Sequence, residues 1–169
     1  GDATAGTDLI ASINRNGLQV EGINVSNGIT FGAGTDALDD YETGSFPPNI
    51  GFNNNTSGIT FQSTPEGIYT KVGRKVTVII SFALANKGNN SGNFTCSLPF
   101  TSISDGQGSG AMGYNYNWVD GDKAKGFTFQ VHSGVLYMMS ANNGSFATNV
   151  EFNNDTFVSG ITVTYFTSE

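Results

Sequence analysis

The chain is poor in cysteine and in basic residues. Cys96 is the single cysteine among 169 residues, so no intrachain disulfide can form and other interactions must stabilise the fold. Seven lysines and arginines stand against fourteen aspartates and glutamates, for a formal net charge of −7. That balance argues against a nucleic-acid groove or an anionic membrane surface and favours neutral partners such as glycans.

Long apolar runs and helix-forming stretches are also missing. No segment is apolar over a length that could cross a membrane, so membrane insertion is not expected. No charged-then-apolar leader is present, and because the chain does not begin with Met we expect it to be a piece of a longer protein. The composition has 23 glycines, 13 phenylalanines and only 12% charged residues, which is typical of short strands joined by polar turns. The sequence therefore predicts an all-β fold.

The clearest local pattern is a β-hairpin between Gly67 and Leu84. Residues 68–72 are rich in strand formers, and Gly73-Arg74 can supply a two-residue turn. Apolar residues then recur at period two, at Val76, Val78, Ile80, Phe82 and Leu84. Burying each would stabilise the fold by roughly 2 kcal/mol before the entropy of ordering the chain is subtracted. A long strand of this kind needs an opposing sheet, so we expect an antiparallel β-sandwich or jelly roll.

Further strands are predicted at regular intervals. Pro47-Pro48 indicates an edge strand or an extended connector, and residues 53–55 and 64–67 are predicted turns. The predicted strands cover residues 58–62, 93–100, 111–119, 127–132, 135–140 and 157–166. In the last of these strands, alternation places two sets of side chains on opposite faces: Ile161, Val163 and Tyr165 on one, and Thr162, Thr164 and Phe166 on the other. Cys96 shares a face with Phe94 and Leu98 and is expected to be a small core residue.

Residues 1–44 form a different kind of segment. The run Asn16-Gly17-Leu18-Gln19-Val20 is echoed eleven residues later by Asn27-Gly28-Ile29-Thr30-Phe31, and each unit is a turn followed by a short strand. One chain cannot bury such strands, so we expect a shaft-like β segment that is stable only as a parallel homotrimer. An edge hairpin lying on the sandwich is the alternative. An acidic run, with Asp36, Asp39, Asp40 and Glu42, is predicted to be a solvated linker or helical turn, with a cation site as the alternative. It leads into a sandwich domain over residues 45–169.

The best candidate binding site is the stretch from Gly113 to Trp118. Strand alternation would place Tyr114, Tyr116 and Trp118 on one face and Asn115 and Asn117 on the other. Aromatic rings stack on the apolar faces of sugars, and amides hydrogen-bond their hydroxyls. The stretch is therefore a candidate carbohydrate site. The alternative interpretation is that the aromatic face belongs to the core or to a trimer interface and the asparagines lie outside.

Catalytic, metal and cofactor sites are not indicated. His132 lies opposite the phenylalanines of its strand and is expected to be exposed, with no partner histidines for zinc. Asp120-Gly121-Asp122 is a hairpin turn in our interpretation, with calcium binding as the alternative. No pair stands out for glycoside hydrolysis among Glu66, Asp105, Asp120, Asp122, Glu151 and Asp155. We therefore expect neither an enzyme nor a resident cofactor.

Four motifs occur in a fixed order along the chain. They are LDDYETG at residues 38–44 followed by Phe46-Pro47-Pro48, GIYTKVGRKVTV at 67–78, LPFT at 98–101 and SGITVTY at 159–165. In this order they resemble the C-terminal β-sandwich domain of tail fibre and tailspike proteins of tailed bacteriophages, over roughly residues 29–169. The chain has Phe46-Pro47-Pro48 where that family usually has Trp-Thr-Pro.

The resemblance implies a homotrimeric, extracellular part of the virion. It implies a position at or near the distal end of a fibre, after a shaft, and attachment to a host-surface glycan or outer-membrane receptor. Three alternatives remain open. The domain could be a structural trimerisation and folding cap without receptor contact, an accessory carbohydrate-binding module of a depolymerase, or a secreted jelly-roll lectin similar to complement-type globular heads.

Overall fold

The computed structural model describes residues 29–30, 37–38, 41–103, 108–119, 126–141 and 144–168, the first two pairs by their backbone only. The chain divides into two compact units, residues 1–37 and 38–169. Two short strands, β1 (Ile29–Thr30) and β2 (Ala37–Leu38), pair as a small sheet. The strand predicted around Leu18 and the linker residues Asp36, Asp39 and Asp40 lie outside the described residues.

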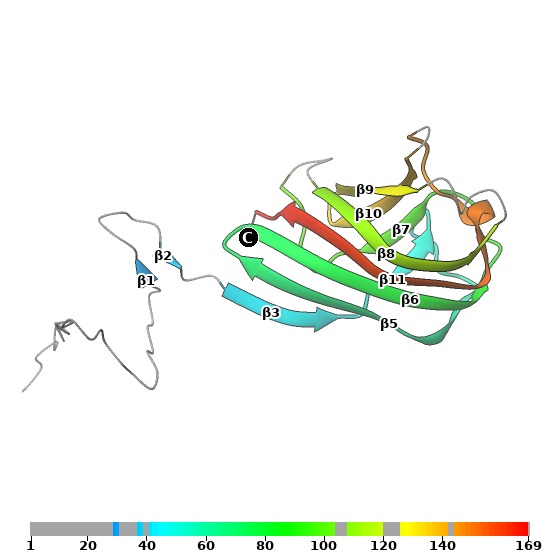
Figure 1. The fold of residues 1–169 in the computed structure, drawn as a ribbon, viewed down its shortest axis with the longest axis horizontal. Helices are drawn as coiled ribbons and strands as arrows, with labels where there is room; N and C mark the ends of the chain where they lie inside the picture. Colours follow the sequence, from blue (N-terminus) through cyan, green and yellow to red (C-terminus); the bar gives the residue numbers. More distant parts are fainter. Residues whose placement is uncertain are drawn as a thin grey trace, which may run out of the picture. The chain divides into compact units, whose positions relative to one another are not determined.

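The second unit is built from two antiparallel sheets, which confirms the predicted all-β class (Figure 1). The four-stranded sheet has the order β4 (Ile50–Phe52), β7 (Phe94–Ser97), β10 (Val135–Ser140) and β9 (Phe127–His132). The five-stranded sheet has the order β3 (Tyr41–Phe46), β5 (Ile59–Val72), β6 (Lys75–Lys87), β11 (Phe152–Phe166) and β8 (Gly108–Trp118). A short 3-10 turn, Asn149–Glu151, precedes β11.

The hairpin predicted between Gly67 and Leu84 is confirmed. Strands β5 and β6 pair from Val72–Lys75 outward, and Gly73 at the turn has φ of +54°, which costs glycine little. The five apolar residues on one face of β6 are all buried. Residues 41–44, assigned to the leading segment from the sequence, form the start of β3 and pair with β5 at the edge of this sheet.

The turn predicted over residues 64–67 is wrong, because β5 runs through it without a break. Ser63 pairs with Ala83 and Glu66 with Ser81, so Thr64 and Pro65 together oppose a single residue of β6. This is a β-bulge, where an unpaired residue is expected. Proline has no N–H to give to the ladder, so a bulge accommodates it within an otherwise continuous strand.

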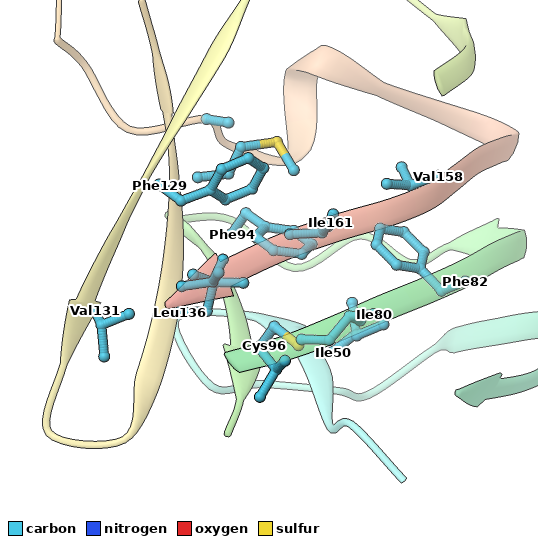
Figure 2. Close-up of a cluster of buried hydrophobic side chains, with 14 of the residues drawn as sticks. Ile50, Ile80, Phe82, Phe94, Cys96, Phe129, Val131, Leu136, Val158 and Ile161 are labelled. Atoms are coloured by element: carbon cyan, nitrogen blue, oxygen red, sulfur yellow. The ribbon is translucent and has the colours of Figure 1, made fainter. Parts of the chain in front are cut away.

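The two sheets meet through an aromatic cluster centred on Phe152. Its ring centroid lies 5.3 Å from that of Phe94, 5.4 Å from Phe52 and 4.4 Å from Trp118. Phe94 also stacks on Phe82 at 5.9 Å. These rings come from both sheets, so their burial joins the two layers. Figure 2 shows the adjoining part of the core, where side chains of the two sheets face each other.

Cys96 is fully buried in that core, as predicted (Figure 2). It pairs with Ile50 of β4, belongs to the same buried cluster as Ile80 and lies on the same strand as Phe94. Because the thiolate would lose its hydration there, burial raises the pKa of the Cys96 thiol to about 12 from its ordinary 9.0. The thiol is therefore neutral and unreactive in the folded chain.

The raised pKa of Cys96 predicts alkaline destabilisation. Above a pH of about 9 the unfolded chain loses the thiol proton that the folded chain keeps up to a pH of about 12. The free energy of unfolding should therefore fall across this range by up to about 1.4 kcal/mol per pH unit. Urea denaturation of the wild type and of Cys96→Ala at several pH values measures the effect. The difference between the two proteins in the slope of unfolding free energy against pH is the contribution of the thiol. Equal slopes in the two proteins would contradict it.

Candidate functional site

The predicted site residues lie on β8, at the edge of the five-stranded sheet. Tyr114 pairs with Ser159 of β11 and Tyr116 pairs with Phe157. The two tyrosines are 56% and 62% exposed on the side of the sheet that faces away from the core. The ring centroids of Tyr114 and Phe157 are 6.0 Å apart. We call Tyr114, Tyr116 and Phe157 the tyrosine patch.

Trp118 does not belong to this patch, so its predicted place on the tyrosine face is wrong. The side chain is only 1% exposed and packs on Phe152 and Phe127, with ring centroids at 4.4 Å and 4.7 Å. Its indole N–H has no hydrogen-bond partner within the described residues, so packing alone positions the ring there. For Trp118, the structure therefore agrees with the alternative interpretation, in which the aromatic side chain belongs to the core.

Asn117 causes this reversal. It has φ of +61°, a left-handed conformation that asparagine tolerates better than most residues and that interrupts the alternation of β8. The Asn117 side chain donates a hydrogen bond to the backbone carbonyl of Asn154 at 2.8 Å, and the backbone carbonyl of Asn117 accepts one from the Thr156 hydroxyl at 2.9 Å. The pairing of β8 with β11 shifts at the same point, between Phe152 and Phe157. The Asn117 amide is therefore a structural group.

Asn115 lies on the other side of the sheet from the tyrosines, as predicted. It pairs with buried Val158 but is itself exposed, because β8 is the sheet edge. The amide is therefore not positioned to help bind a ligand on the tyrosine patch.

Polar groups near the patch come from other strands. The hydroxyls of Ser81 and Ser159 are 3.4 Å apart, next to Tyr114 in the ladder. Beyond Phe157 on β11, the Asp155 carboxylate accepts a hydrogen bond from the Gln62 amide at 3.0 Å. Local sequence could not reveal these neighbours, because only the order of strands β5, β6, β11 and β8 brings them together.

A concave feature lies at the opposite edge of the same sheet from the tyrosine patch. A cavity of about 310 Å³ is lined by Ser45, Phe46, Pro47, Pro65, Glu66, Gly67 and Ile68. Its walls are largely apolar, with one carboxylate. The ring of Phe46 lies directly over Gly67, where an added Cβ would be 2.5 Å from the ring. Pro47 and Pro65 are evident in the sequence, but the β-bulge at Pro65, which is part of the cavity wall, is not.

Beside this cavity, at the β3 edge of the sheet, a carboxylate accepts a hydrogen bond from a tyrosine. The Tyr69 hydroxyl donates to the Glu42 carboxylate across the β3–β5 pair. This hydrogen bond, with smaller contributions from desolvation and the negative charge of Glu42, raises the pKa of Tyr69. Glu42, which the sequence placed in the acidic run, therefore lies on β3 and is hydrogen-bonded to Tyr69.

The remaining candidate residues from the sequence analysis are His132, Glu151, Asp105, Asp120 and Asp122. His132 is exposed, as predicted, and its ring lies edge-on to Tyr137 at 6.5 Å. Glu151 accepts hydrogen bonds from the Thr148 backbone and hydroxyl. Within the described ranges, no three His, Cys, Asp or Glu side chains are grouped as metal ligands would be, and no helix has the length and apolarity to span a membrane. Asp105, Asp120 and Asp122 lie outside the described residues.

Comparison with protein-family models, with curated proteins and with solved structures found no match to this chain. The functional argument therefore depends on the residues themselves and on the motif resemblance.

The left-handed conformation of Asn117 predicts a specific pattern of stability. Asn117→Ala should lower the free energy of unfolding by about 1–2 kcal/mol, because alanine is strained at positive φ and loses the side-chain hydrogen bond. Asn117→Gly loses the same hydrogen bond without the strain, so it should be less destabilising. Chemical denaturation of both variants measures the difference. A glycine variant no more stable than the alanine variant would refute the strain argument.

Proposed function

We propose that this domain is the distal part of a trimeric tail fibre or tailspike of a tailed bacteriophage, and that it binds a host-surface glycan. The four ordered motifs support the fibre assignment. The observation that carries the binding role is the tyrosine patch, in which two largely exposed tyrosines lie beside Phe157 on one face.

The chemistry of the patch suits a sugar better than a charged ligand. Exposed aromatic rings offer flat apolar surfaces on which the C–H faces of a pyranose can stack. The Ser159 hydroxyl and the Asp155 carboxylate lie on β11 close to Phe157 and can hydrogen-bond sugar hydroxyls. No lysine or arginine contributes to the patch, so attraction to an anionic group is not part of the proposal.

Weak binding at one patch is sufficient in a fibre. Three copies around one axis, and several fibres on one virion, turn later binding events into intramolecular ones with a high effective concentration. Attachment would then be strong even where each patch binds its glycan with low affinity.

Removal of the tyrosines tests the proposal. On an array of host-derived glycans, Tyr114→Ala and Tyr116→Ala should each weaken single-site binding about tenfold, equivalent to about 1.4 kcal/mol. Val150→Ala is the matched control, because Val150 is an exposed apolar side chain on the 3-10 turn and is not part of the patch. Binding by the wild type that survives both tyrosine substitutions would place the site elsewhere. Absence of binding to any host-surface fraction would favour the structural-cap alternative.

A further inference from the structure

The exposed apolar side chains of this domain are not scattered. Among the described residues, eight of the ten large ones lie on the outer side of the five-stranded sheet, away from the four-stranded sheet. Three of them form the tyrosine patch at one end. The other five occupy the rest of that side: Tyr41, Ile68, Val72, Ile79 and Phe166.

These five belong to a continuous surface of four ladder rows, which we call the threonine–isoleucine face. One row runs Thr43, Thr70, Thr77, Thr164 and Ser109 across all five strands. The next runs Ser45, Ile68, Ile79, Thr162 and Ala111, and the outer rows add Tyr41, Val72, Lys75 and Phe166 at one end and Glu66 and Ser81 at the other. Thr77 and Thr164 are hydrogen-bonded through their hydroxyls at 3.1 Å.

Charge is almost absent from this face. Glu66 and Lys75 are its only ionisable side chains apart from the Tyr41 phenol, and their charges are of opposite sign. Residues 41–169 carry eight aspartates and glutamates and six lysines and arginines, a formal charge of −2, so electrostatic repulsion between two sandwich domains is weak. Depletion of charge with retention of aromatic and apolar residues is the composition of a protein–protein interface core.

The size of the face also fits an interface between chains. The sixteen ladder positions of the face, on strands about 4.8 Å apart and in rows about 6.8 Å apart, cover a plane of roughly 520 Å². A stable interface buries about 600–1,000 Å² on each partner, so the face would supply most of one copy's share of an interface. A sugar residue would cover only a small fraction of it.

The face is hollowed near its centre. A depression of about 70 Å³ lies among Ile68, Tyr69, Thr70, Thr77 and Ile79, where one side chain of a neighbour could insert. The sequence of β6 agrees with a covered face. Its central run, Val78 to Ala83, is almost continuously apolar, a pattern typical of strands that are buried on both sides.

We propose that the threonine–isoleucine face packs against a second copy of this chain and is the main contact that holds the sandwich domains together. This inference deepens the trimeric part of the proposed function and rests on it for the number of copies. In a closed threefold ring the contact is heterologous, so each copy offers this face to one neighbour and a different surface to the other. One substitution on the face would then weaken all three contacts at once.

The test is the molar mass of the full chain, measured by light scattering over a dilution series. The wild type should have the mass of three chains. Ile79→Glu, at a position 41% exposed, should raise the concentration at which the assembly dissociates at least about thirty-fold, because it buries an unpaired charge in the contact. Ile68→Glu on the neighbouring strand is the second variant, and Val150→Glu is the control that should keep the wild-type mass. Thermal melting monitored by circular dichroism verifies that each variant is folded.

Each outcome is decisive. Folded variants with the wild-type mass, or a wild type that stays a single chain at high concentration, would overturn the inference. A two-chain mass that both face variants dissociate would support the face and overturn the trimer. If the masses behave as expected but neither the wild type nor the variants bind any host glycan, the attachment role fails and the self-association surface stands.

Discussion

The packing of aromatic rings around Phe152 is the interaction on which the rest of the domain depends. Phe152 contacts rings from both sheets, and the layers share one buried cluster in the described residues. With no disulfide possible, this burial and the ladders are the main sources of stability. The aromatic cluster also sets which side of the five-stranded sheet is the inner one, and therefore which side chains remain outside.

The edge strand β8 shows how the core shapes the candidate site. Trp118 is drawn into the cluster beside Phe152, and the left-handed conformation of Asn117 absorbs the change of direction. Tyr114 and Tyr116, before that point, stay on the outer side with Phe157. The same irregularity that completes the core therefore leaves the tyrosine patch exposed.

The outer side of the five-stranded sheet combines two chemically different surfaces. The tyrosine patch, at the β8 end, has aromatic rings with hydroxyls and a carboxylate nearby, which suits a polar ligand with apolar faces. The threonine–isoleucine face is rich in β-branched side chains and close to neutral. Association through the second surface would leave the first at the margin of the assembly, so self-association and ligand binding are compatible on one sheet.

The sequence by itself determined the features that depend on strand alternation. The hairpin of β5 and β6, the burial of Cys96 and the opposed facing of Ile161 and Thr162 all follow from a period of two, because neighbouring side chains in a strand must point to opposite sides.

Only the tertiary structure decided the features that depend on irregular pairing or on strand order. The bulge at Pro65 and the reversal at Asn117 break the period, and no local pattern marks where a strand will do so. The sheet order placed Tyr114 beside Phe157 and aligned threonines from four strands, residues far apart in sequence. Such neighbours depend on which strands pair, and pairing is chosen by the burial of the whole core.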